Sequence, residues 1–250
     1  MKFSAASLSH IGLFRETNED AFCQFEPDDD EVRAKKGVLF VVADGMGGHQ
    51  GGEVASRLAV EFIKQNYYSS DDPDPVQSLK SAFLEANRRV FEKSLDDSSL
   101  FGMGTTCTAM VLIGNEAFIA HIGDSRAYVC RNGDIIQLTR DHTLVEDMVR
   151  SGLLTSEDAR IHPKKNVITK SLGTHEEVEA DTPSSPFVAK ESDVFLLCSD
   201  GLTSFVRDND IKKTLETHDP PKASQLLIDM ANRLGGRDNI TVQVIKIESA

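Results

Sequence analysis

The sequence has 250 residues, a length that fits one large domain or two small ones, because single cores usually stop growing at about 250–300 residues. It carries 27 Lys and Arg residues against 40 Asp and Glu residues, a net charge of −13. This acidic balance argues against a nucleic-acid binder or a polybasic membrane anchor, so we expect neither partner. The apolar runs are far shorter than the roughly 20 residues of a membrane span. The four cysteines contain no C-x-x-C pair, which is typical of reduced thiols in a cytoplasmic protein.

Hydrophobic periodicity predicts strands and helices in alternating groups. Apolar residues recur at three- and four-residue steps in the helical segments, whereas continuous or alternating apolar runs indicate strands. In chain order we expect a strand at 37–43, helices at 52–67 and 75–93, strands at 105–113, 116–122, 126–131 and 134–138, a strand at 194–198, a helix at 221–234 and a strand at 240–247. The dipeptides Gly114-Asn115 and Asn132-Gly133 are hairpin signals, so the group of four strands predicts an antiparallel meander.

Amphipathic helices that cover the outer faces of antiparallel sheets give a layered α+β sandwich, which is the fold class we predict. We expect residues 1–250 to form a single domain. Polar residues 27–31 and 69–75 predict surface loops. Residues 143–185 are less regular and more polar, and they predict short helices inserted between strands as a flap.

Four aspartates lie beside apolar strands. Asp44 follows residues 38–43, Asp124 follows 117–122 and Gly123, Asp200 follows 194–199, and Asp238 precedes the strand that begins at Ile240. A single such aspartate is usually a turn or N-cap residue. Four together predict carboxylates on one rim of the sandwich, where divalent cations relieve their repulsion. All-oxygen donors favour Mg²⁺, Mn²⁺ or Ca²⁺, and carboxylates that keep several waters per ion favour Mg²⁺ or Mn²⁺.

Two further motifs lie near the N-terminus. The glycine-rich segment Asp44–Gly52 brings backbone close to an ion or phosphate, although it is neither a P-loop nor a dinucleotide fingerprint. In Arg15-x-x-Asn18-Glu19-Asp20 the arginine can bind a phosphate bidentately while the acids face a metal. A surface ion pair is the commoner explanation of such a match taken alone.

Rival hydrolase signatures fit poorly. None of the four cysteines begins the C-x₅-R loop of a thiol phosphatase. The segment Asp72-Pro73-Asp74-Pro75-Val76 follows a polar stretch, and we interpret it as a loop and a helix N-terminus. The segment Gly123-Asp124-Ser125-Arg126-Ala127 nearly matches the serine-hydrolase elbow, but a strand rather than a helix follows it. A serine esterase remains a distant alternative.

With these motifs placed, the sequence resembles the PPM family of metal-dependent serine/threonine protein phosphatases (type 2C) in its compact bacterial form. The resemblance runs from Arg15 to Val242. The matching segments occur in the family's order and are Arg15-x-x-Asn18-Glu19-Asp20, Asp44-Gly45-Met46-Gly47-Gly48-His49, Gly104-Thr105-Thr106, Gly123-Asp124-Ser125-Arg126, Leu138-Thr139-x-Asp141-His142, Ser199-Asp200-Gly201-Leu202 and Asp238-Asn239-Ile240-Thr241-Val242.

The resemblance implies a four-layer α-β-β-α sandwich and a site for two Mn²⁺ or Mg²⁺ ions. It implies that Asp44 bridges the ions, that Asp200 and Asp238 hold the first, and that the Gly45 carbonyl holds the second. Glu19 and Asp20 would act directly or through water. Bacterial members often carry a third ion, which here would lie between Asp124 and Asp200.

The implied reaction is hydrolysis of phosphoserine and phosphothreonine in proteins by a metal-activated water, with Arg15 gripping the phosphate. Met46 stands where eukaryotic relatives have a general-acid His, and His49 is the nearest substitute, although packing explains His49 equally well. The resemblance further implies phosphorylated Ser/Thr proteins as substrates and a companion Ser/Thr kinase in signalling. We also expect a cytoplasmic monomer. The alternative is a catalytically silent phosphoprotein-binding regulator of the same fold.

Overall fold

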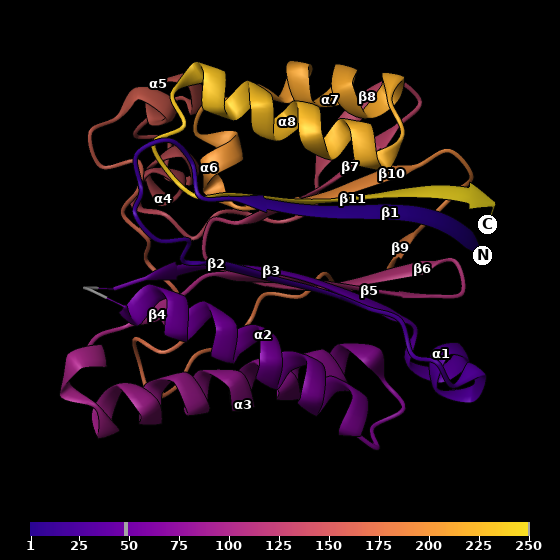
Figure 1. The fold of residues 1–250 in the computed structure, drawn as a ribbon, viewed down its shortest axis with the longest axis horizontal. Helices are drawn as coiled ribbons and strands as arrows, with labels where there is room; N and C mark the ends of the chain where they lie inside the picture. The colour runs from indigo at the N-terminus through magenta and orange to yellow at the C-terminus, as the bar shows by residue number, and fades with distance from the viewer. Residues whose placement is uncertain (48–49, 250) are drawn as a thin grey trace.

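Two antiparallel sheets packed face to face form the centre of the molecule in the part of the chain that the computed structural model describes, residues 1–47 and 50–249 (Figure 1). The spatial order of the first sheet is β1 (Lys2–His10), β11 (Ile240–Ser249), β10 (Val194–Cys198), β7 (Arg126–Arg131) and β8 (Asp134–Gln137). The order of the second is β2 (Asp20–Phe25), β3 (Val38–Met46), β5 (Cys107–Ile113), β6 (Glu116–Ile122) and β9 (Phe187–Val188), and β4 (Gly104–Thr105) pairs with β3.

Helices cover the outer face of each sheet, which confirms the predicted four-layer α+β sandwich (Figure 1). Helices α2 (Gly51–Ser69) and α3 (Pro75–Asp96) pack on the second sheet, and α7 (Asp208–Thr217) and α8 (Pro220–Leu234) pack on the first. The remaining helices are α1 (Asp30–Lys36), the 3₁₀ turn η1 (Ser98–Leu100), α4 (Leu144–Arg150), α5 (Ser156–Ile161) and α6 (Asp200–Thr203). Among the described residues, no helix is long and apolar enough to cross a membrane.

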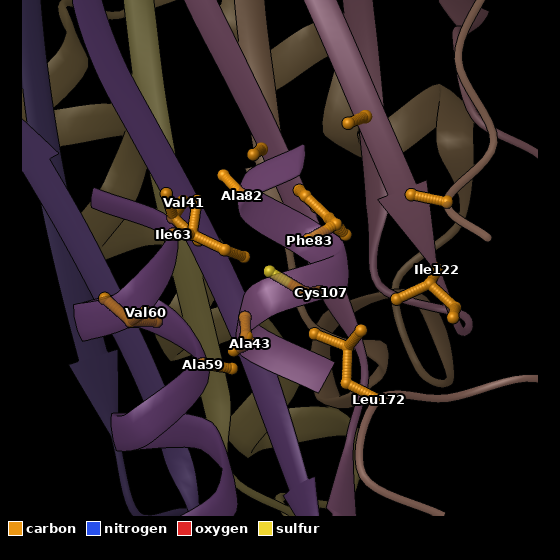
Figure 2. Packing of buried hydrophobic residues seen from close by; sticks show 14 of the residues in the cluster. Val41, Ala43, Ala59, Val60, Ile63, Ala82, Phe83, Cys107, Ile122 and Leu172 are labelled. Carbon is orange, nitrogen blue, oxygen red and sulfur yellow. The ribbon is translucent and has the colours of Figure 1, made fainter. Parts of the chain in front are cut away.

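The unbroken apolar run of β3 follows from burial on both of its faces. Successive side chains of a strand point to opposite sides, so Val41 and Ala43 face the helices whereas Phe40 and Val42 face the other sheet. Figure 2 shows the helical side, where Ile63 of α2 and Phe83 of α3 pack above the strands. A corresponding cluster lies between α7, α8 and the first sheet.

The predicted four-stranded meander is wrong. β5 pairs with β6 in one sheet and β7 pairs with β8 in the other, so the chain crosses between sheets after β6. Both hairpins form where their dipeptides predict, because such dipeptides determine only the local pairing. The short link at residues 123–125 carries Asp124 across the gap at the end of the sandwich.

Two smaller expectations also change. Residues 27–31 are not wholly loop, because α1 begins at Asp30, where the Asp29 carboxylate accepts from the backbone amides of Glu31 and Val32 as an N-cap. Asp44 lies within β3 rather than after it. The two termini lie side by side at one end of the sandwich, whereas α4 and α5 lie at the opposite end (Figure 1).

Candidate active site

Asp44 is held by the backbone of β3 and by the Gly104-Thr105-Thr106 segment. The Asp44 amide donates to Thr106 Oγ1 at 3.0 Å, and the Asp44 carbonyl accepts from the Thr106 amide at 2.9 Å. Thr105 Oγ1 donates to the same carbonyl at 2.9 Å. Asp20 on β2 lies directly opposite Asp44 in the strand register. The second sheet therefore fixes two carboxylates next to each other.

The other aspartates reach the same place from different elements. Asp124 follows β6 of the second sheet, Asp200 opens α6 directly beyond β10, and Asp238 precedes β11. Because β10 and β11 are neighbours in the first sheet, Asp200 and Asp238 approach from the side opposite Asp44. Both sheets thus contribute carboxylates to one end of the sandwich.

A cavity of about 360 Å³ opens where these elements meet. Its lining residues are Arg15, Glu19, Asp44, Gly45, Met46, Gly47, Asp124, Asn166, Ile168, Asp200 and Asp238. Five of these residues are acidic and one is basic. The predicted convergence of the four strand-end aspartates is therefore observed, and Glu19, Gly45 and Arg15 join them.

Arg15 supplies the positive charge of this lining. Its guanidinium contacts both carboxylate oxygens of Asp238, at 2.8 and 3.0 Å, and lies 3.8 Å from Glu19. The side chain keeps 46% of its surface exposed, so its outer face is open to solvent at the mouth of the cavity. Arg15 can therefore meet an anion from solution without first being uncovered.

The carboxylates resist ionisation when no cation is near them. Burial raises the pKa of Asp44 well above its ordinary value, and Asp20 and Asp200 raise it further by repulsion. Burial also raises the pKa of Asp200 to about 6, and the charge of Asp238 adds to the shift. The pKa of Asp124 rises well above its ordinary value through burial and then through Asp200. Concentrated negative charge of this kind favours a bound cation.

Asp20 lies behind the cavity, where hydroxyl groups hold one of its oxygens. Ser199 Oγ and Thr241 Oγ1 donate to its Oδ2 at 2.8 and 2.7 Å. Its Oδ1 is buried and has no hydrogen-bond partner among the described residues. Burial raises the pKa of Asp20 to about 7, although the two hydroxyl groups oppose the shift. A buried acceptor without a donor is a place where a cation or its water fits.

Gly45 permits a close backbone approach that a larger residue would prevent. A Cβ at this position would lie 2.0 Å from the Gly52 carbonyl oxygen and 2.6 Å from that of Glu19. The Gly45 amide donates to the Glu19 carbonyl at 3.1 Å. The start of α2 and the Glu19 segment therefore press against Gly45 directly.

The donor chemistry fits a hard divalent cation. The lining offers carboxylate and carbonyl oxygens, and the lining residues in the described part of the chain include neither His nor Cys, the donors that zinc favours. No three His, Cys, Asp or Glu side chains in residues 1–47 and 50–249 are gathered closely enough to hold an ion as they stand.

Some functional residues were assigned no role from sequence. Asn239 accepts from the Glu19 amide at 2.8 Å and donates to the Ile11 and Thr17 carbonyls, so it shapes the Arg15–Glu19 segment. Its place inside the Asp238 motif was the available signal. Asn166 and Ile168 enter the cavity wall without any sequence signal. His49 lies outside the described residues.

The serine-hydrolase elbow is not supported. Ser125 is fully buried, and its hydroxyl lies 2.6 Å from Thr106 Oγ1. Arg126 begins strand β7 instead of a helix. Ser125 therefore packs the link between the sheets instead of presenting a nucleophile.

A helix-covered pair of sheets with acids from both sheets at one end is the sandwich of the phosphatase class that the sequence resembles. Residues 4–148 match the family model described as protein phosphatase 2C. The chain therefore belongs to the protein phosphatase 2C family.

Relatives and solved structures agree with this assignment. The serine/threonine phosphatase Stp of Listeria monocytogenes is 36% identical over 240 residues, which cover 94% of this chain and 92% of the relative. The structure of the S. agalactiae serine/threonine phosphatase superposes with a TM-score of 0.89 at 35% identity, over 99% of this chain and 100% of that one. The catalytic domain of the phosphatase PstP, in complex with 2 manganese ions, gives a TM-score of 0.85 at 34% identity, over 99% of each chain.

Proposed function

We propose that this chain is a protein serine/threonine phosphatase that uses Mn²⁺ or Mg²⁺ to hydrolyse phosphoserine and phosphothreonine. The observation that carries the proposal is the cavity whose described lining brings five acidic residues together with one arginine. Names of relatives about 35% identical over most of the chain support the reaction. They also favour an active enzyme over a silent phosphoprotein-binding regulator of the same fold.

The cavity residues divide into groups by the donors that they offer. Asp44 would serve both ions, Asp200 and Asp238 would hold the first, and the Gly45 carbonyl would hold the second. Glu19 and Asp20 would contribute directly or through water. A third ion would use Asp124 with Asp200. The raised pKa values of Asp44 and Asp200 support this assignment, because a cation replaces the protons that these groups otherwise retain.

The protein's own groups bind and orient the substrate. Arg15 presents two parallel N–H groups that match two phosphoryl oxygens, and its exposure allows the phosphate to enter from solvent. When bound, divalent ions neutralise phosphoryl charge and lower the pKa of a bound water, which supplies the nucleophile. Arg15 stabilises negative charge on the equatorial oxygens, and the carboxylates would hold the cations that do the same.

A proton must also reach the leaving Ser or Thr oxygen. His49 stays a prediction for this role, and it lies outside the described residues. We further propose that the substrates are products of a Ser/Thr kinase in the same cell, and that the chain acts as a cytoplasmic monomer. The −13 net charge supports protein partners over nucleic acid.

Phosphate release from a phosphothreonine peptide tests the proposal. The peptide is incubated with the full chain in Mn²⁺, in excess EDTA, and in EDTA followed by surplus Mn²⁺. We expect turnover, loss of turnover, and recovery, respectively. Turnover that is indifferent to the chelator would contradict the metal-dependent reaction, and peptide binding without phosphate release would support the silent regulator.

A further inference from the structure

His142 lies directly behind the Asp124 turn and outside the lining of the acidic cavity. Its side chain is buried, and its own amide donates to the Gly123 carbonyl at 2.7 Å. The Gly123 amide in turn donates to His142 Nδ1 at 3.0 Å. Both polar groups of Gly123 are therefore bound by one residue, and the next residue along the chain is Asp124.

The opposite edge of the imidazole ring faces Asp181. His142 Nε2 lies 3.1 Å from Asp181 Oδ2, although the contact does not have the geometry of a hydrogen bond. Because Nδ1 accepts from Gly123, the proton of the neutral ring must be on Nε2, facing the carboxylate. Lys170 and Arg140 also contact Asp181, at 2.7 and 3.6 Å.

Asp181 is itself fixed to the second sheet. Its backbone exchanges hydrogen bonds with His121 of β6, at 2.8 and 2.9 Å. The His121 ring stacks on the His142 ring with 5.0 Å between centroids. The carboxylate and the stacked ring together hold the His142 side chain in one orientation.

His142 also lies at the point where residues 143–185 leave and rejoin the body. The Thr169 amide donates to the His142 carbonyl at 2.8 Å, and the Leu144 amide donates to the Val167 carbonyl at 2.9 Å. His142 and the nearby Leu144 are thus bonded to residues 167–169 of this segment. The neighbouring Asn166 lines the acidic cavity.

Asp124 is the group that this arrangement reaches. It is 7% exposed, and it lines both the acidic cavity and a neighbouring cavity of about 340 Å³ under α4 and α5. The turn before it is clamped on its other side, because Gly123 has a φ of +101° and a Cβ there would lie 2.5 Å from Thr106. The backbone that carries Asp124 can therefore shift little unless His142 releases Gly123.

We propose that His142 is a positioning residue for the phosphatase reaction, that it sets the Asp124 carboxylate through the Gly123 amide, and that Asp181 orients its ring. The inference rests on the proposed function. Groups that orient the ligands of a catalytic site typically change activity by about 10- to 100-fold when they are removed. His142 has the contacts of such a group although it touches neither cavity.

Substitutions at His142 separate positioning from general packing. His142→Leu removes the acceptor for the Gly123 amide, and we expect kcat for p-nitrophenyl phosphate with Mn²⁺ to fall about 10- to 100-fold. In His142→Asn the amide oxygen takes the place of Nδ1, so most of the loss is recovered. Asp181→Asn should also lower kcat, but by less than His142→Leu does. It serves as a second variant if His142→Leu does not fold.

A double-mutant cycle with Asp124→Asn makes the test specific. If His142 acts through Asp124, the loss caused by His142→Leu largely disappears in the Asp124→Asn background. The matched control is Asp193→Asn, which breaks a buried pair with Arg131 on the first sheet. The control should lower Tm and leave kcat unchanged.

Three results would overturn the inference. They are losses that multiply in the double variant, an Asp124→Asn variant with wild-type kcat, and a His142→Leu variant that behaves like Asp193→Asn. In all three cases the wild-type chain still hydrolyses the substrate, so only the role of His142 is refuted. If the proposed function itself is wrong, the wild-type chain shows no turnover.

Discussion

The hydroxyl of Thr106 joins the two segments that carry Asp44 and Asp124. Thr106 Oγ1 accepts from the Asp44 amide at 3.0 Å and lies 2.6 Å from Ser125 Oγ. Thr106→Val keeps the shape of this buried side chain and removes both interactions. We expect the substitution to loosen Asp44 against the Asp124 turn and to reduce both stability and turnover.

The expected magnitude follows from the two lost contacts. A buried amide left without an acceptor costs about 1–3 kcal/mol, and the lost hydroxyl pair adds about 0.5–1.5 kcal/mol. The free energy of unfolding should therefore fall by roughly 2–4 kcal/mol, which lowers Tm by about 5–15 °C in a chain of this size. Since domains are typically stable by about 5–15 kcal/mol, the variant remains folded at 25 °C.

Urea unfolding and phosphopeptide turnover measure the two effects on the same preparations. Thr106→Ser restores the hydroxyl and should recover most of kcat. Thr214→Val is the control, because the Thr214 hydroxyl donates to the Asp210 carbonyl within α7 and its loss should cost less than about 1 kcal/mol. Equal stability and equal kcat in Thr106→Val and Thr214→Val would refute the reasoning.

Two further predictions concern pH and metal. Burial, and then the neighbouring His142, lower the pKa of His121 to about 4 in the folded chain. In the unfolded chain this histidine takes up a proton near pH 6.5. The free energy of unfolding should therefore fall by about 3 kcal/mol as the pH is lowered from 6.5 toward 4. Urea midpoints across this range should fall less in His121→Asn, and parallel slopes would contradict the assignment. Mn²⁺ at about 100 times its dissociation constant should stabilise the wild-type chain by about 2.7 kcal/mol and raise Tm by roughly 5–10 °C. EDTA should reverse the increase in Tm. An unchanged Tm would count against a metal site.

Much of the fold could be predicted because its signals are local. The apolar stripe of α3 follows Pro75 at its first turn, and β10 was predicted with the same bounds that the structure shows. β1 was not predicted, because its small and polar residues give no strand pattern. It forms a strand through its pairing with β11. The crossing from β6 to β7 depends on which sheet each hairpin joins, and this is decided by tertiary packing.

The residues of the site also differ in whether local sequence or tertiary packing determines their place. The aspartates could be placed on one rim because strand ends in a sandwich meet there. The roles of Asn239 and Asn166 could not be predicted, because Asn239 acts through backbone groups of a distant segment and Asn166 arrives from residues 143–185. Contacts of this kind depend on the folded chain rather than on spacing.

The most direct measurement is equilibrium dialysis of Mn²⁺ against the wild-type chain and against Asp44→Asn. Circular dichroism first confirms that both proteins are folded to the same extent. We predict that the wild-type chain binds about two ions tightly, as in two-metal hydrolytic sites, and that the variant loses this tight binding. Retention of the same number of ions with the same affinity by Asp44→Asn would contradict the assignment of the acidic cavity as the metal centre.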